Sequence, residues 1–230
     1  MTCMRARWED VFGVGPVVID GGLSTQLAHA GHDVSGQLWT GRVLLEQPEA
    51  ITQAHAAFAA AGADVVITAS YQVSRKGFAA AGLSTADADA ALRASVEAAR
   101  SAVEVSGRPV RVAASVGPYG AILHDGSEYR GRYDLSSRQL TDFHRERIEV
   151  LLEEGPDLLA VETIPDLDEA VAILEVLRDV EVPAWLTFSA ADGEHLNAGQ
   201  RIEEAAAVAA DSGLVMAVGI NCTEPAYLPA

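Results

Sequence analysis

Six short runs of Val, Ile, Leu and Ala recur along this chain of 230 residues. They occupy residues 17–20, 63–69, 110–116, 157–163, 184–189 and 214–221. Each run is continuously apolar and lacks the alternation of a strand with one wet face. Strands of this kind are buried on both faces, which is typical of a parallel sheet. We therefore expect a core built on parallel strands.

Segments with helical patterning separate these runs. They begin near Pro48, Ser84, Ser136, Asp166 and Ile202, and all but the fourth end at a glycine: Gly62, Gly107, Gly155 and Gly213. A proline at the start and a glycine after the end is the asymmetry that helices favour. Glu169 follows Asp166 by three residues, which resembles a capping box. Strand and helix alternate over the whole length, so the chain is expected to have an α/β fold.

The arrangement of polar residues favours a barrel over an open nucleotide-binding sheet. No GxGxxG follows the first run and no Walker loop is present in the sequence. Polar residues instead follow nearly every run, as in a (β/α)8 or TIM barrel, whose site lies at the strand C-termini. Six β/α units are expected here, where a complete barrel has eight. We predict a single β/α-barrel domain over residues 1–230, incomplete at its C-terminus.

Charge and composition limit the classes of partner and compartment. The formal net charge is −17, which opposes binding to nucleic acid or to an anionic membrane. The two cysteines, Cys3 and Cys222, lie at opposite ends of the chain and suggest a reducing compartment. The first ten residues do not form a signal peptide, and no run has the length of a membrane span. The sequence predicts a cytoplasmic protein.

Two carboxylates stand out at strand ends. Asp20 precedes Gly21 and Gly22, and the two glycines allow a close approach of backbone to a ligand. A tight turn with Asp20 as a cap explains the same motif. Glu162 and Thr163 end a buried strand, where a carboxylate is costly unless it is paired or functional. An ion pair to a loop arginine is the structural alternative, and we favour a functional role for Glu162.

Asn221 and Cys222 end the last run. A single cysteine is most often a small buried apolar residue, but at a strand end it is also a candidate nucleophile or metal ligand. The single lysine, Lys76, is expected in a loop beside Arg75, which disfavours Schiff-base chemistry. The six histidines have no HxH or HExxH spacing, so a histidine-based metal site is not indicated. His55 and His144 lie in helical patterns and are expected on the surface or in packing.

Taken in order, seven stretches resemble the homocysteine S-methyltransferase family. They are residues 20–25, 62–72, 115–121, 125–131, 143–145, 158–165 and 219–222. Each stretch is modest alone, but seven in the same order over nearly the whole chain are specific. Residues 68–72 and 115–121 look most like the branch that takes methyl groups from S-methylmethionine or S-adenosylmethionine.

The resemblance implies a zinc enzyme on a β/α barrel that methylates homocysteine to methionine. Zinc would be held by three cysteines, of which Cys222 matches one. Glu162 would hold the amino group of homocysteine and Asp20 would lie beside the substrates, so these two are the implied catalytic residues. The implied substrate-binding residues are Gly21, Gly22, Tyr71, Gln72, Ser115, Tyr129, Thr163 and Asn221. The Gly-Gly-Cys-Cys motif that supplies the other two zinc ligands in the family is absent from this sequence.

Two other functions remain open from the sequence. One is an inactive, truncated homologue that binds a small molecule or a protein partner. The other is a barrel lyase or hydrolase that uses Glu162 as its base. Zinc content and methyl transfer to homocysteine would separate the methyltransferase from both. The sequence does not fix the methyl donor or the oligomeric state.

Overall fold

The computed structural model describes residues 6–34, 36 and 38–227 of the chain. Its helices are α1 (Trp8–Phe12), α2 (Leu23–His29), α3 (Thr40–Glu46), α4 (Pro48–Ala61), α5 (Arg75–Ala80), α6 (Thr85–Ser106), α7 (Ser137–Glu153), α8 (Leu167–Leu177) and α9 (Ile202–Asp211). The strands are β1 (Val65–Ile67), β2 (Arg111–Val116), β3 (Leu158–Ile164), β4 (Ala184–Phe188) and β5 (Ala217–Ile220). Short 3-10 helices are η1 (Tyr119–Ile122), η2 (Ser127–Tyr129) and η3 (Pro225–Tyr227).

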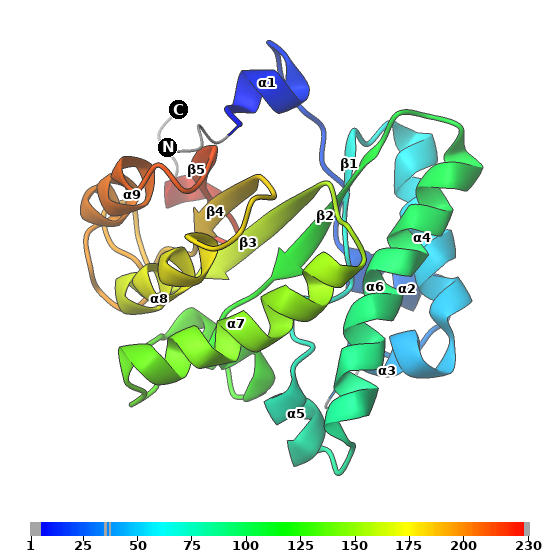
Figure 1. Cartoon of the computed structure of the whole chain (residues 1–230), viewed down its shortest axis with the longest axis horizontal. Coiled ribbons are helices and arrows are strands. Elements are labelled where there is room, and N and C mark those ends of the chain that lie inside the picture. The colour runs from blue at the N-terminus through cyan, green and yellow to red at the C-terminus, as the bar shows by residue number, and fades with distance from the viewer. Residues whose placement is uncertain (1–5, 35, 37, 228–230) are drawn as a thin grey trace. The chain divides into compact units, whose positions relative to one another are not determined.

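The strands form one sheet in the order β1-β2-β3-β4-β5, and the pairs β1–β2, β3–β4 and β4–β5 are parallel. The predicted α/β fold with a parallel sheet is therefore confirmed. Strand order follows chain order, as it does around a β/α barrel. Figure 1 shows the strands with the helices that connect them.

The first predicted strand is reduced to a single bridge. Residues 17–20 contribute only a parallel bridge from Ile19 to Val65, so five strands are formed among the described residues where six were predicted. Val18 and Ile19 remain 55% and 49% exposed. A segment with one face left open gains little free energy from burial, which disfavours a regular strand here. The segment also follows Pro16, which has no backbone N–H to donate to a neighbouring strand.

The predicted helix ends are largely confirmed. Pro48 is the first residue of α4, and Gly62 follows its end at φ 115°, a backbone conformation that glycine accepts without strain. Ser84 caps α6, and its capping-box partner is Asp87. The capping box predicted at α8 was wrong. Asp166 does cap the helix, but Glu169 bonds to His144 and to the Tyr119 amide instead.

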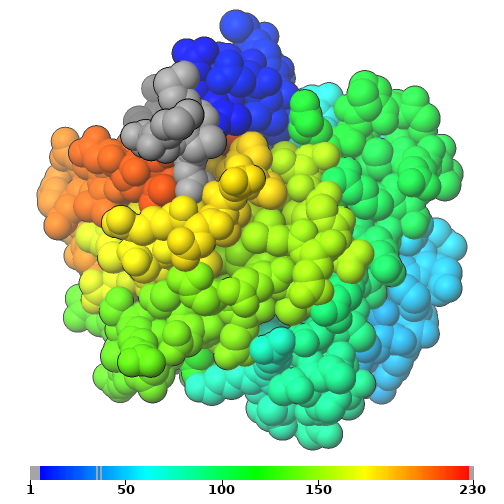
Figure 2. Space-filling view, viewed as in Figure 1, coloured from blue at the N-terminus to red at the C-terminus, as the bar shows by residue number. Residues whose placement is uncertain are grey.

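Residues group into two compact units, each described here by itself. One consists of 15–115 and 147–158 and includes β1 and α6, which packs against α3, α4 and α5. The other consists, among the described residues, of 6–14, 116–146 and 159–227. In this second unit α9 packs against α8 and against β5. The yellow and orange segments adjoin on the face of the molecule that Figure 2 shows. The single-domain organisation stays a prediction.

Candidate functional site

Three parallel strands of the second unit, β3, β4 and β5, end at Ile164, Phe188 and Ile220. Carboxyl ends of neighbouring parallel strands meet at one edge of a sheet, so the residues that follow them lie together. This edge carries Thr163 and Asn221, which the sequence analysis predicted as site residues. Both residues thus lie at the edge where the sequence analysis expected polar groups to gather, and their role in a site stays a prediction.

Glu162 and Thr163 lie where β3 departs from regular pairing. The register of β3 against β4 shifts between Val161 and Ile164, which is a β-bulge. Thr163 is 1% exposed and has φ 63°, a strained value for a β-branched residue. Bulges of this kind re-aim side chains and are common beside active sites. Backbone strain that persists in a buried position marks β3 as a candidate functional strand end.

The Asn221 side chain joins all three strand ends. Its Oδ1 accepts hydrogen bonds from the Thr163 amide and from the Thr187 hydroxyl, both at 2.9 Å. Its Nδ2 donates to Thr163 Oγ1 at 2.8 Å. The amide of Asn221 is thus fixed in one orientation by two neighbouring strands. The sequence analysis missed Thr187, although a hydroxyl inside the apolar run 184–189 was a signal for it.

Two hydrogen-bond donors face the Cys222 sulfur. Thr163 Oγ1 and Asn221 Nδ2 each lie 3.7 Å from Cys222 Sγ. Cys222 is exposed and its backbone has φ 46°, the left-handed region. A sulfur that faces two polar donors does not lie in the apolar surroundings of a packing cysteine. This environment favours a functional reading of Cys222 over the buried apolar one.

The Tyr129 side chain adds a third polar group. Its pKa is raised, first by burial and then by the negative charge of Cys222 and by Glu128. The ring is nevertheless 47% exposed, so one side of it faces solvent beside the sulfur. Tyr129, Thr163, Asn221 and Cys222 therefore form one group, which we call the strand-end cluster.

The other predicted residues belong to the unit of residues 15–115 and 147–158. Asp20 turns its carboxylate into the protein: Oδ2 accepts from the Ile67 amide at 2.9 Å and lies 3.7 Å from His55 Nδ1. His55 is fully buried there, and so is His144 in the other unit, so both are packing residues and neither is on the surface. Gly21 and Gly22 form the turn into α2, with Gly22 at its N-cap.

Polar contacts also tie the ends of β1 and β2 together. Thr68 Oγ1 accepts from the Ser115 amide at 3.0 Å, and Ser70 Oγ donates to the Ser115 carbonyl at 2.7 Å. Arg147, 1% exposed, donates to the carbonyls of Ser70 and Tyr71. The sequence analysis missed Arg147, whose helical neighbours gave no sign of burial. Gln72 is 5% exposed, and neither of its amide atoms has a hydrogen-bond partner within the described chain.

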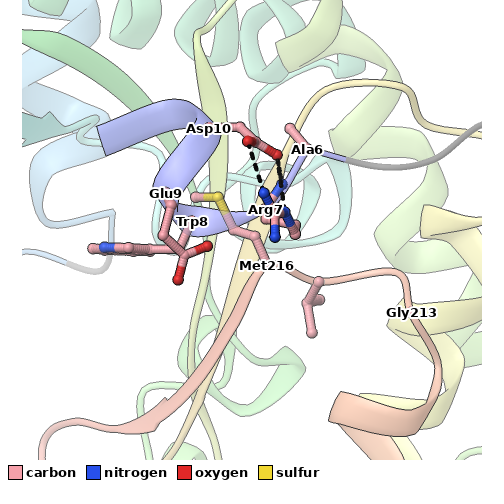
Figure 3. Close-up of a pocket in the computed structure, with 8 residues that line it drawn as sticks. Ala6, Arg7, Trp8, Glu9, Asp10, Gly213 and Met216 are labelled. Atoms are coloured by element: carbon pink, nitrogen blue, oxygen red, sulfur yellow. Dashed lines mark hydrogen bonds and ion pairs between the residues drawn. The ribbon is translucent and has the colours of Figure 1, made fainter. Parts of the chain in front are cut away.

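A separate hollow of about 720 Å³ is formed by the N-terminal segment and the segment that leads into β5 (Figure 3). It is lined by Ala6, Arg7, Trp8, Glu9, Asp10, Gly213, Val215 and Met216. Arg7 and Asp10 form an exposed ion pair of 3.3 Å. No residue of the strand-end cluster lines this hollow, so it is not the predicted site.

The described residues contain no group of three or more His, Cys, Asp or Glu side chains placed to hold a metal ion. Cys222 is the free cysteine that the structure describes, and Cys3 lies outside the described residues. No helix in the described part of the chain is long and apolar enough to cross a membrane.

Comparison with known proteins gives a consistent set of relatives. The family described as Homocysteine S-methyltransferase matches residues 17–230. Homocysteine S-methyltransferase 3 of Arabidopsis thaliana is 42% identical over 94% of this chain and 69% of its own length. Homocysteine S-methyltransferase YbgG of Bacillus subtilis is 43% identical over 93% of this chain and 71% of its own.

Solved structures agree with these sequence relatives. The metallated form of the homocysteine methyltransferase MmuM from Escherichia coli is 42% identical and superposes with a TM-score of 0.87. That match covers 92% of this chain and 76% of the other. The apo form of the same protein gives a TM-score of 0.75 at 35% identity.

Proposed function

Because the chain belongs to the homocysteine S-methyltransferase family, we propose that it serves methyl transfer from a sulfonium donor to the thiol of homocysteine, giving methionine. The donor we propose is S-methylmethionine or S-adenosylmethionine. The observation that carries the proposal is the strand-end cluster, in which Thr163 and Asn221 direct polar groups at the Cys222 sulfur.

The proposed reaction is a single displacement. The homocysteine thiolate attacks the methyl carbon, a new carbon–sulfur bond forms, and the bond from that carbon to the sulfonium sulfur breaks. The donor leaves as a neutral thioether, so it needs no proton from an acid. A free thiol has a pKa near 8.5 and is mostly protonated at neutral pH, so the site must favour the thiolate. The residues proposed for this site therefore bind and orient homocysteine and stabilise its thiolate.

We assign the substrate contacts as follows. Glu162, on the β3 bulge, is proposed to bind the ammonium group of homocysteine. Thr163 and Asn221 are proposed to fix the geometry of the Cys222 loop, and Tyr129 to border the substrate. Asp20, Gly21, Gly22, Tyr71, Gln72 and Ser115 remain proposed substrate contacts. The hydrogen bond of Asp20 to the Ile67 amide also supports a structural role for that carboxylate.

Zinc is the metal that we propose for the family activity, with Cys222 as one ligand. The metallated form of the Escherichia coli relative supports a metal. A catalytic zinc normally has three protein ligands, whereas the described residues contribute one thiolate and no three-ligand group. The residues described here do not fit a complete zinc site, and we therefore derive no step through the metal.

Methyl transfer from each donor tests the proposal directly. Purified protein is incubated with homocysteine and either S-methylmethionine or S-adenosylmethionine, and methionine is measured by mass spectrometry. Because the residues described lack the other zinc ligands, the assay includes a version extended with the remaining segment of a relative. Methionine formation by the extended version supports the assignment. Its absence with both donors, in a folded and zinc-loaded protein, refutes it.

The missing ligand set also favours a second candidate function. A protein with the strand-end cluster but no complete metal site would bind homocysteine or another small amino acid without methylating it. Isothermal titration with homocysteine and methionine separates the two candidates. Binding of homocysteine by the 230-residue chain, with no methionine formed by it or by the extended version, would support the binding protein.

A further inference from the structure

Residues 117–132 form the first part of the connection from β2 to α7 and carry Tyr129, and we call them the Tyr129 loop. The loop is cross-linked internally. Asp125 Oδ1 accepts from the amide and hydroxyl of Ser127, and Arg130 bonds to both of these side chains. A Cβ at Gly120 would collide with the backbone of Ser127 and Glu128, so η1 and η2 touch closely. The loop is therefore a compact body that can be fixed by a few external contacts.

Glu169 holds the beginning of the loop. It lies in the first turn of α8 and is fully buried. Its Oε1 accepts from the Tyr119 amide at 2.6 Å and from His144 Nε2 at 2.8 Å. Around it, Tyr119 packs against Tyr133 and Phe143 with ring centroids 5.2 and 5.0 Å apart. A buried carboxylate is costly unless it is paired or hydrogen-bonded. Loss of the Tyr119 amide as a donor would therefore be unfavourable, and this cost holds the beginning of the loop in place.

Asp166 holds the end of the loop. It is 4% exposed, and its Oδ2 accepts from the Arg132 amide at 2.9 Å. Its Oδ1 accepts from Gln200 Nε2 at 2.7 Å and from the Asp168 amide at 3.0 Å. Gly131 lies so near that an added Cβ would be 2.9 Å from Asp166 Cβ. One carboxylate thus joins the loops that follow β2, β3 and β4.

We infer that Asp166 and Glu169 are positioning residues, which act through the Tyr129 loop to hold the Tyr129 side chain against Cys222. Asp166 caps α8 and Glu169 lies in its first turn, and this helix follows the β3 strand that carries Thr163. The helix therefore ties the position of Tyr129 to the strand end that fixes Asn221 and Cys222. Functional groups need such support because a small displacement weakens their contacts. The inference deepens the proposed function, on which its catalytic meaning rests.

Fluorine NMR of the 230-residue chain labelled with 3-fluorotyrosine tests this inference without any need for activity. The chain has five tyrosines, so five resonances are expected, and Tyr129→Phe identifies the one from Tyr129. Cys222→Ser should shift that resonance because the Cys222 side chain hydrogen-bonds to that of Tyr129. Asp166→Asn keeps an oxygen for Gln200 and the Asp168 amide but presents an NH2 group to the Arg132 amide. It should therefore shift or broaden the Tyr129 resonance while those of Tyr71 and Tyr227 stay.

Asp168→Asn is the matched control, because Asp168 is exposed on the same turn and should leave the spectrum unchanged. An unchanged Tyr129 resonance in Asp166→Asn would overturn the inference. If that variant does not fold, Gly131→Ala perturbs the same contact from the loop side and is judged by the same two results. The NMR experiment does not depend on methyl transfer. A protein without activity can therefore still confirm or refute the positioning role of Asp166 and Glu169, and the methyl-transfer assay tests the proposed function independently.

Discussion

At the scale of single residues, the bulge of β3 determines the geometry around Cys222. Thr163 keeps an unfavourable φ of 63° because four contacts hold it: its amide and hydroxyl both bond to Asn221, its hydroxyl faces Cys222, and its carbonyl accepts from Ser189. Strain of this kind persists only where the surroundings over-determine the conformation.

The Thr163 hydroxyl should therefore be needed for stability. Thr163→Val keeps the size of the side chain and the backbone strain, but it removes the hydroxyl that accepts from Asn221 Nδ2. We expect the free energy of unfolding to fall by about 1–2 kcal/mol, as for other hydrogen bonds removed from buried positions. Urea denaturation measures the change. Thr163→Ser retains the hydroxyl and is the control. If the free energy of unfolding fell equally in Thr163→Val and Thr163→Ser, packing and not the hydrogen bond would stabilise this strand end.

Glu162→Gln tests the proposed contact with the substrate. The change removes a charge but keeps the size of the side chain. In the extended version that transfers methyl groups, KM for homocysteine should rise about tenfold or more, which corresponds to the loss of about 1.5–3 kcal/mol for a charged hydrogen bond. Steady-state kinetics provides the measurement, with the exposed Glu204→Gln on α9 as control. An unchanged KM would refute the assignment of Glu162.

At the scale of elements, helix ends show which local signals are sufficient. Ser84 and Asp87 form the capping box of α6 because both partners lie within one turn, with no help from other elements. At α8 the same spacing of Asp166 and Glu169 gives a different result, since Tyr119 and His144 compete for Glu169. A capping pattern is reliable only where no buried group competes for the acid.

The capping box of α6 should make stability depend on pH. Hydrogen bonds from Ser84 hold the pKa of Asp87 below its ordinary value of 3.8. A lowered pKa in the folded state means that the stabilisation is present above the unfolded pKa and is lost as pH falls through the folded value. The difference in unfolding free energy between wild type and Asp87→Asn should therefore shrink below about pH 4. Chemical denaturation between pH 3 and 6 measures it.

Glu97→Gln is the matched control for this experiment, because Glu97 is exposed on the same helix. Its difference from wild type should show no such dependence. A wild-type advantage over Asp87→Asn that stays constant down to pH 3 would contradict the role of the Asp87 carboxylate.

At the scale of the whole molecule, the number of metal ligands limits activity. One thiolate cannot hold zinc tightly, and the described residues provide no three-ligand group around Cys222. We predict that a polypeptide of these 230 residues binds zinc weakly or not at all and forms no methionine from either donor. Elemental analysis and a methionine assay measure both quantities.

The extended version should regain zinc and turnover together, and Cys222→Ser should remove both. Stoichiometric zinc in the 230-residue polypeptide, lost in Cys222→Ser and accompanied by methionine formation, would contradict the prediction. Such a result would mean that ligands other than the family's cysteines complete the site.

The sequence by itself determined the α/β class, most helix ends and the strand-end positions of Glu162, Thr163, Asn221 and Cys222. These follow from local periodicity and from the rule that parallel strands end together, both of which can be read from neighbouring residues. Cytoplasmic location and the absence of nucleic-acid partners, argued from charge and cysteine content, stay predictions. Tertiary structure decided that residues 17–20 form only a bridge, since the exposure of Val18 and Ile19 depends on what covers them.

Tertiary structure also decided the partners of the buried polar groups. Nothing in the sequence near Glu169 indicates the Tyr119 amide, which is 50 residues away in the chain, and nothing near Asp166 indicates Arg132 or Gln200. The bulge at Thr163 and the three bonds that orient Asn221 likewise arise from strands paired across long separations. A hydrogen bond requires a distance near 3 Å and a direction, and only the folded chain sets these between residues that are far apart in sequence.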